Sequence, residues 1–182
     1  MANAAFIDGF LLSYYSWQSS RIPAERAQPL ADVVDANTRS RMMAGIRGKN
    51  TTPEVRLRKA LHRAGFRFRL HCTKLPGKPD IVLAKHRAAI FVHGCFWHRH
   101  AGCRNSSVPK SNTEFWKVKF ARNVERDKAN LKALIGSEWR VCIVWECAIR
   151  QRGEKFVAEE VAEWTASSLE IVKVIPAQPS AT

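Results

Sequence analysis

The chain has 182 residues and a formal net charge of +14, because 30 Lys and Arg residues outnumber 16 Asp and Glu residues. The length fits one domain with terminal extensions, and the charge favours a polyanionic partner such as nucleic acid. The five cysteines are an odd number, and the chain shows neither a signal-type leader nor a long apolar run, which argues against a disulfide scaffold and against a membrane protein. We therefore predict a cytoplasmic protein with reduced cysteines.

The first 36 residues differ in composition from the rest of the chain, since they are apolar and aromatic and then turn-rich. We expect residues 1–36 to form an extension, residues 37–170 the functional domain and residues 171–182 a C-terminal tail. The basic segment 38–50 fits a phosphate contact and a solvated helix equally well.

A first helix is predicted to have Thr52 as its N-cap, Pro53 at its first position and Gly65 just past its end. Glu54 lies in the first turn, where the positive end of the helix dipole favours a carboxylate in any case. The apolar positions of this helix follow helical spacing and are expected to face the core: Val55, Leu57, Leu61 and Ala64.

Three strands are predicted to follow this helix. Residues 66–70 alternate strictly between apolar and basic side chains, as in a half-buried strand. Residues 81–84 and 88–92 are apolar and β-rich and flank a short polar turn, which is typical of a hairpin. In an antiparallel pair the start of one strand lies beside the end of the other, so we expect Asp80 and His93 to meet at one edge of the sheet.

The remaining elements are two helices and one strand. A helix over residues 113–135 ends at Gly136 and carries Asp127 on its apolar stripe, where a carboxylate must be paired. Residues 139–145 are almost continuously apolar, as in a strand that is covered on both faces and parallel to the third strand. The order predicts an α/β fold in which helices flank a central mixed sheet. A last helix over residues 154–169 is expected to point four side chains to the core: Phe156, Val157, Val161 and Trp164.

Cysteine and histidine residues form a first candidate metal site. The strand 139–145 should lie beside the hairpin. Cys147 lies just past the end of this strand and should therefore reach the loop that follows the hairpin, which contains Cys95. His98 competes with His100 in this loop, and unliganded reduced cysteines are the alternative to a metal site. Cys142 is expected to be a core residue and Cys72 to lie apart. Four residues are predicted to hold a structural Zn²⁺: Cys95, His100, Cys103 and Cys147.

A second candidate site combines oxygen donors with histidines. Between residues 38 and 113 the acidic residues are Glu54 and Asp80 alone. In so basic a region they either neutralise buried cations or hold a hard cation that contacts phosphate. Mg²⁺ suits such donors, and a neutral histidine can take a proton from an attacking water, so the groups fit phosphodiester hydrolysis. The members of this site are Asp80, Glu54, His93, His98 and Asp127.

Three aromatic residues lie beside these groups in the sequence: Phe96, Trp97 and Trp116. Tryptophan is more often a core residue, but adjacent aromatics in a polar loop rich in glycine and histidine are poorly placed to be buried together. Apolar side chains inserted between base steps open a duplex. We therefore expect these three residues to act as wedges in DNA.

Six motifs together resemble the very short patch repair (Vsr) DNA mismatch endonucleases: TRSRMMAGI, TPEVRLRKAL, LPGKPDIV, IFVHGCFWH, TEFWKVKFARNVERD and WRVCIVWECAIR. The resemblance extends over about residues 35–152. It implies a PD-(D/E)xK restriction-endonuclease-like core in which Phe-Val-His at 91–93 replaces the usual second acidic residue and lysine. It also implies a Mg²⁺-dependent nick on the 5′ side of the thymine in a T·G mismatch that arises by deamination of 5-methylcytosine.

The resemblance also implies roles for single positions. Asp80 is the metal-binding carboxylate, the carbonyl of Val92 is a second ligand, and His98 is the general base. The chain has one extra residue between His100 and Cys103, so the zinc loop is where its geometry is expected to differ. Glu54, His93 and Asp127 hold metal-bound waters and neighbouring groups, while Cys95, His100, Cys103 and Cys147 bind zinc and Phe96, Trp97 and Trp116 intercalate.

The implied substrate is double-stranded DNA with a T·G mismatch, acted on in the bacterial cytoplasm close to the nucleoid. Mismatch-repair proteins and a cytosine-5 methyltransferase are the implied functional partners. Two other functions stay open at this point: a zinc-stabilised DNA-binding or mismatch-sensing module without catalysis, and a restriction-type endonuclease with the same core that cuts both strands. The first of these leaves Asp80 and His98 without a role.

Overall fold

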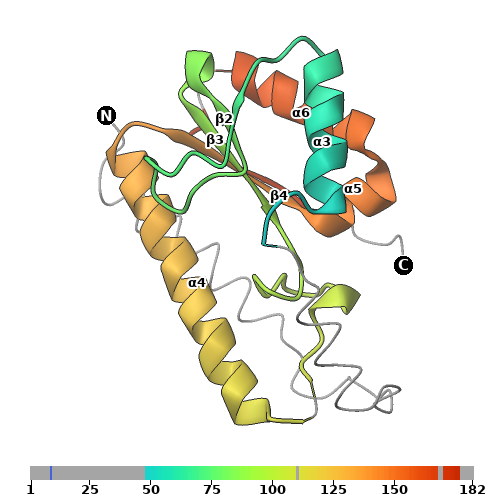
Figure 1. Cartoon of the computed structure of the whole chain (residues 1–182), viewed down its shortest axis with the longest axis vertical. Helices are drawn as coiled ribbons and strands as arrows, with labels where there is room; N and C mark the ends of the chain where they lie inside the picture. The colour runs from blue at the N-terminus through green and yellow to red at the C-terminus, as the bar shows by residue number, and fades with distance from the viewer. Residues whose placement is uncertain (1–8, 10–47, 110, 168–169, 177–182) are drawn as a thin grey trace.

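The computed structural model describes residues 9, 48–109, 111–167 and 170–176 (Figure 1). The expectations for residues 1–36 and for most of the basic segment 38–50 lie outside these residues. Among the helices that are described, none is long and apolar enough to cross a bilayer.

A five-stranded mixed sheet forms the centre of the protein, with its strands in the order β1-β2-β3-β4-β5. β1, β2 and β3 pair antiparallel, whereas β3, β4 and β5 pair parallel. The predicted mixed sheet is therefore confirmed. The strands span Arg69–Leu70 (β1), Ile81–Leu83 (β2), Ala88–His93 (β3), Arg140–Trp145 (β4) and Val172–Ile175 (β5).

Four α-helices in the described part of the chain cover the two faces of the sheet (Figure 1). α4 packs on one face, and α3, α5 and α6 pack on the other. This arrangement confirms the predicted α/β class with helices that flank the sheet. The helices span Thr52–Arg63 (α3), Thr113–Gly136 (α4), Glu146–Arg152 (α5) and Glu154–Ala166 (α6).

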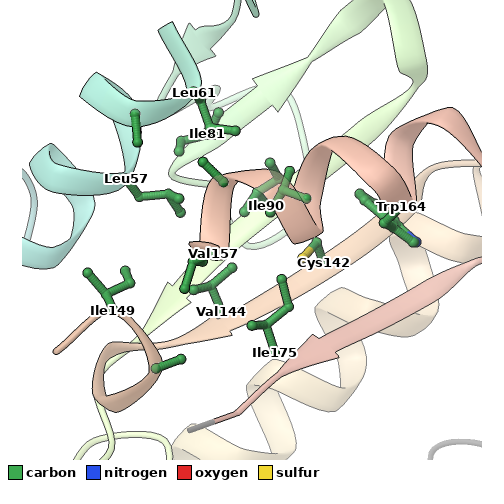
Figure 2. Packing of buried hydrophobic residues seen from close by; sticks show 14 of the residues in the cluster. Leu57, Leu61, Ile81, Ile90, Cys142, Val144, Ile149, Val157, Trp164 and Ile175 are labelled. Carbon is green, nitrogen blue, oxygen red and sulfur yellow. The ribbon is translucent and has the colours of Figure 1, made fainter. Parts of the chain in front are cut away.

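β4 lies between two hydrophobic cores, because successive side chains of a strand point to opposite faces. Cys142 and Val144 pack in the core beneath α3, α5 and α6, which Figure 2 shows. Val141, Ile143 and Trp145 pack in the core beneath α4. All five side chains are at most 2 % exposed, which confirms a strand covered on both faces.

The N-cap of α3 is Thr51 and not Thr52 as predicted. The hydroxyl of Thr51 donates to Oε1 of Glu54 at 2.8 Å, and the Thr51 N–H lies 3.4 Å from the same oxygen. A capping box of this kind needs a Thr three residues before a Glu, and Thr51 rather than Thr52 has that spacing. At the other end, Ala64 is the C-cap and is exposed, although it was expected to face the core.

The predicted hairpin is confirmed. β2 and β3 pair antiparallel with Ile81 opposite Ile90, and a short 3-10 turn connects them through Arg87, whose φ is +46°. This register places Asp80, directly before β2, beside the end of β3. The predicted strand over residues 66–70 is shorter than expected, since only its last two residues form β1.

The sequence does not predict α5 or β5. α5 has seven residues and no side-chain cap, so it lacks the usual signals of a helix start. β5 lies within the expected tail and is ordered by its pairing with β4 at the edge of the sheet. The predicted inward position of Phe156 is wrong, because this side chain is 62 % exposed while the neighbouring Val157 is fully buried.

Candidate active site and metal centre

An open cleft with a volume of about 1050 Å³ lies where β3 and β4 end. Because β3 and β4 are parallel and in register from Ala88 opposite Arg140 to His93 opposite Trp145, their carboxyl ends lie at the same edge of the sheet. β2 runs the other way, so its first residues reach this edge too. The walls of the cleft therefore come from the start of α3, the start of β2, the loop after β3 and the middle of α4.

Asp80 is a largely buried carboxylate directly before β2, with its side chain 19 % exposed. Its Oδ2 atom accepts a hydrogen bond from the backbone N–H of Val92 at 2.8 Å. Burial and, to a lesser extent, the nearby Glu54 carboxylate raise the pKa of Asp80, whereas the Val92 hydrogen bond and Arg58 lower it, and the net result is a pKa of about 6. Within the described residues its ion-pair partner is a histidine, His71, at 3.8 Å, and not a lysine or arginine. The charge of Asp80 thus fits a bound cation.

Glu54 is compensated in a different way. Its Oε2 atom accepts from the guanidinium of Arg58 at 2.6 Å and from the backbone N–H of Asn50 at 3.0 Å. Both side chains of this ion pair are largely buried. The sequence left two explanations for the isolated carboxylates, neutralisation of a buried cation and binding of a hard cation. Glu54 fits the first, because it pairs with Arg58, and Asp80 fits the second.

His71 is a site residue that the sequence analysis missed. It belongs with Glu54 and Asp80 to a group whose potential ligand atoms all lie within 4.8 Å of one another. Burial and the charge of Arg58 lower the pKa of His71. A single histidine after a two-residue strand carries no spacing signal, so only the folded chain identifies it.

His98 and Asp127 face each other across the cleft wall, with Nδ1 of His98 2.5 Å from Oδ2 of Asp127. The prediction that Asp127 must be paired on the inner side of its helix is confirmed. His93 stacks on His98 with ring centroids 3.9 Å apart and planes 7° apart. Burial lowers the pKa of His93 well below its ordinary value, and His98 lowers it further, so this ring is neutral.

The predicted oxygen-rich site is thus two groups along one cleft rather than a single cluster. Glu54 and Asp80 lie with His71, whereas His93, His98 and Asp127 form the second group. The ligand atoms of the second group are also close enough to hold an ion. However, the lone pairs of an imidazole lie in its ring plane, and two stacked, parallel rings cannot direct both lone pairs at one ion about 2 Å away. The second group is better suited to proton transfer.

The four predicted zinc ligands converge as expected, with their ligand atoms within 4.8 Å of one another: Cys95, His100, Cys103 and Cys147. Nδ1 of His100 lies 3.5 Å from Sγ of Cys95 and 3.2 Å from Sγ of Cys147. Between His100 and Cys103 the chain turns at Gly102, whose φ of +70° suits glycine. His98 pairs with Asp127 instead, so His100 and not His98 is the histidine of the predicted zinc site.

The chemistry of this cluster fits a metal ion. The hydrogen bond with Cys147 and burial raise the pKa of the Cys95 thiol, so its thiolate needs a nearby cation. Four nitrogen and sulfur donors without an open position are consistent with a structural zinc site.

The predicted core position of Cys142 is confirmed, because this residue is fully buried in the opposite core. The backbone N–H of Cys95 also donates to Oε1 of Glu146 at 3.0 Å, which ties the loop to α5.

The three predicted wedge residues form one aromatic cluster next to the cleft. Phe96 makes edge-on contacts with Trp97, Trp116 and Phe120, with centroids 5.0 to 5.4 Å apart. The adjacent Phe96 and Trp97 are both only partly buried, as expected. Trp116 differs, because it is only 8 % exposed and packs against Phe120 one helical turn later. Phe115 is the exposed aromatic residue of this region, at 57 %.

Comparison with known proteins shows similarity to a DNA mismatch endonuclease and to type II nicking enzymes. The family model for DNA mismatch endonuclease Vsr matches residues 31–104. The chain is 44% identical to the DNA mismatch endonuclease Vsr of Escherichia coli strain K12 over 138 residues, which cover 74% of this chain and 88% of that protein. It is also 44% identical to the type II nicking enzyme V.XorIIP of Xanthomonas oryzae over 124 residues (68% and 90%), and 42% identical to the type II nicking enzyme V.NmeAIP of Neisseria meningitidis over 123 residues (68% and 87%).

A first prediction concerns the cysteine cluster. Cys147→Ser should lower the zinc content per chain, and the free energy of unfolding should fall by a few kcal/mol, a part of the ~10–16 kcal/mol that structural zinc supplies in small zinc domains. Elemental analysis and urea unfolding measure the two effects. Cys142→Ser is the matched control, because it alters a buried cysteine outside the cluster and should cost stability without loss of zinc. An unchanged zinc content in Cys147→Ser would contradict the assignment.

A second prediction concerns the buried charge of Asp80. Because the folded protein raises this pKa from 3.8 to about 6, the folded state holds the proton more tightly, and the free energy of unfolding falls as pH rises through this window. Asp80→Asn has no such titration. Without magnesium, the stability of the variant relative to the wild type should therefore increase by about 2 kcal/mol between pH 4 and pH 7.

Urea unfolding of both proteins at several pH values tests this prediction. The exposed control Glu159→Gln should show no such trend. Because all three proteins share the zinc cluster, its own pH dependence cancels in the comparison. A stability difference between Asp80→Asn and the wild type that stays constant with pH would contradict the raised pKa.

Proposed function

The chain belongs to the Vsr DNA mismatch endonuclease family, and from this premise we propose that it nicks duplex DNA on the 5′ side of the thymine in a T·G mismatch. Such mismatches arise when 5-methylcytosine is deaminated, so the nick would start very short patch repair. The observation that carries the proposal is that one cleft contains both Asp80 and the His98–Asp127 pair, and that Asp80 is a largely buried carboxylate with no lysine or arginine ion-pair partner among the described residues.

We assign the catalytic divalent ion, Mg²⁺, to Asp80 and the carbonyl of Val92. In a β-strand the N–H and C=O of one residue point to the same side. Since the N–H of Val92 points to Asp80, its carbonyl faces that side as well, and an ion there can contact both oxygens. Oxygen donors of this kind suit Mg²⁺. Mg²⁺ bound there would polarise a phosphate oxygen and neutralise charge that develops on the phosphate.

His98 is the general base in this proposal. Asp127 holds Nδ1 of His98, so Nε2 is the nitrogen that can accept a proton from the attacking water. The Asp127 carboxylate also stabilises the imidazolium that forms. His93 supports this step because it is neutral and stacked on His98, and a second charged ring in that place would oppose protonation. Glu54 keeps its buried ion pair with Arg58 and positions the start of α3 beside the ion.

The proposal extends to the fold and to the substrate. A mixed sheet with Asp80 at the start of one strand and residues 91–93 at the end of the next is compatible with a PD-(D/E)xK core. The aromatic cluster around Trp97 lies beside the cleft, with Nζ of Lys119 5.3 Å from the Trp97 ring centroid, which suits contact with both bases and phosphate. A cytosine-5 methyltransferase would be the functional partner, because its product yields the T·G pair.

A second candidate function is supported by the similarity to the type II nicking enzyme V.XorIIP, which at 44% identity equals that to the mismatch endonuclease of Escherichia coli. An enzyme of that kind would nick according to the sequence around the site. Matched and T·G duplexes with varied flanking bases distinguish the two, since only mismatch nicking requires the T·G pair. Cleavage of both strands of matched DNA would identify the restriction-type alternative instead.

The test of the proposed chemistry is Asp80→Asn. The amide keeps the shape of the side chain but lacks the charge that holds the ion, so nicking of a T·G duplex in Mg²⁺ should fall by at least about 10³-fold while binding to that duplex is retained. The exposed carboxylate-to-amide control Glu159→Gln should nick like the wild type. Mg²⁺-dependent nicking by Asp80→Asn at the wild-type rate would remove the basis of the assignment.

A further prediction concerns mismatch recognition. Trp97 is half-buried and reaches the cleft, so its ring should stack against the bases beside the T·G pair. Trp97→Ala should weaken the preference for T·G over matched DNA by about 10-fold or more, since base stacking on an aromatic ring contributes about 1–3 kcal/mol. The salt dependence of binding, which lysines and arginines determine, should change little.

Affinities for T·G and matched duplexes at two salt concentrations measure these effects. The exposed Phe156→Ala on α6 is the control and should leave both affinities unchanged. If Trp97→Ala instead keeps its discrimination and loses thermal stability, Trp97 acts as a packing residue and the wedge interpretation fails.

A further inference from the structure

His71 lies between a buried cation and the buried carboxylate of the cleft. It follows β1 directly, and its backbone has a φ of +46°, which is uncommon for a residue other than glycine. The backbone N–H of His71 lies 3.4 Å from the carbonyl oxygen of Asp80. The same turn brings Nδ1 of the imidazole to 3.8 Å from Oδ1 of Asp80.

Arg58 determines which ring nitrogen of His71 carries the proton. Nη2 of Arg58 lies 3.0 Å from Nε2 of His71, and a guanidinium can only donate hydrogen bonds. Nε2 must therefore accept, which places the single proton of the neutral imidazole on Nδ1. Oδ1 of Asn50 also approaches Nε2, at 3.3 Å, but it accepts a much shorter bond of 2.5 Å from Nη1 of Arg58. Asn50 thus accepts from the charged guanidinium of Arg58 rather than from His71, and the His71 tautomer with its proton on Nδ1 is favoured.

Arg58 is itself held in place. It is 8 % exposed, and Oε2 of Glu54 accepts from its Nη2 at 2.6 Å. The contacts thus form a chain from Glu54 through Arg58 and His71 to Asp80. At its end Nδ1 of the His71 ring lies 3.8 Å from Oδ1 of Asp80, a separation longer than a hydrogen bond at which a ring N–H still attracts the carboxylate, while the backbone N–H of Val92 donates to Oδ2.

We propose that His71 is a positioning residue, which uses its Nδ1–H, fixed by Arg58, to orient the Asp80 carboxylate toward the cation. This inference rests on the proposed function, because it assumes that Asp80 holds the catalytic ion. His71 is not itself a ligand in this arrangement, since Nδ1 carries a proton and Nε2 faces Arg58. Groups that orient a metal ligand in this way typically change metal affinity or activity by ~10–100-fold when they are replaced.

The first test reads the tautomer and does not depend on metal binding or catalysis. Nitrogen NMR of the full, zinc-loaded chain with labelled histidine, in magnesium-free buffer near pH 7.5, reports which ring nitrogen is protonated. His71→Asn identifies the His71 signals by their disappearance. The account expects a neutral ring with the proton on Nδ1. A neutral ring with the proton on Nε2, or a doubly protonated ring, would overturn it.

The second test compares two substitutions, each of which places an amide group near the position of one of the two ring nitrogens. His71→Asn places an amide N–H near the position of Nδ1, whereas His71→Gln places its amide near Nε2, so only the first retains the donor that faces Asp80. Binding of Mn²⁺ to the zinc-loaded protein is measured by the loss of the free-ion electron paramagnetic resonance signal. We expect His71→Gln to weaken Mn²⁺ binding by about 10-fold or more and His71→Asn to stay within about 3-fold of the wild type.

Three controls separate the possible failures. His62→Gln alters an exposed histidine of α3 and should bind Mn²⁺ like the wild type. Thermal unfolding of both His71 variants is recorded, because a positive φ favours Asn over Gln and would show in stability. Equal Mn²⁺ affinities of the two His71 variants would overturn the role of His71. Wild-type Mn²⁺ binding by Asp80→Asn would instead overturn the proposed metal site itself.

Discussion

The parallel pairing of β3 with β4 is the contact on which both sites depend. Six residue pairs, from Ala88 and Arg140 to His93 and Trp145, bring the ends of these strands to one edge of the sheet. β3 continues into the loop with the first three ligands of the cysteine cluster, and β4 continues into α5 with the fourth. Because β2 pairs antiparallel on the other side of β3, the Asp80 carboxylate enters at the same edge. A shift in this register would separate both sets of residues.

Three carboxylates of the cleft differ in how their charge is compensated, and this difference indicates what each one does. Glu54 faces the guanidinium of Arg58, and Asp127 faces the imidazole of His98, so both have a partner within the fold. Asp80 receives one backbone N–H and has no lysine or arginine ion-pair partner among the described residues. A buried charge of this kind costs stability, and a bound cation removes that cost. In the proposed function, the same charge that weakens the metal-free fold would therefore contribute to binding of the ion.

The sequence predicted the fold best where the local pattern of apolar residues agrees with the contacts that the segment makes in the folded chain. The hairpin and the apolar β4 could be predicted from periodicity alone, and the position of Cys147 followed from the expected neighbour of that strand. β5 could not be separated from a tail, because a segment of four residues with three β-branched side chains, directly before Pro176, fits both a short strand and a tail. His71 was missed since its role depends on Arg58, thirteen residues earlier and on another element. The burial of Trp116 was missed because Phe120 completes its packing only once α4 has formed.

The central claim is that the catalytic ion lies against Asp80 and Val92, and not in the neighbouring group of His93, His98 and Asp127. Both groups line the same cleft, and both have ligand atoms close enough to hold an ion. Anomalous X-ray scattering from crystals of the zinc-loaded protein soaked in Mn²⁺ locates the ion directly. The account predicts a manganese peak beside the Asp80 carboxylate and the Val92 carbonyl, with His98 outside its coordination sphere. A peak coordinated by His98 and Asp127 would contradict it.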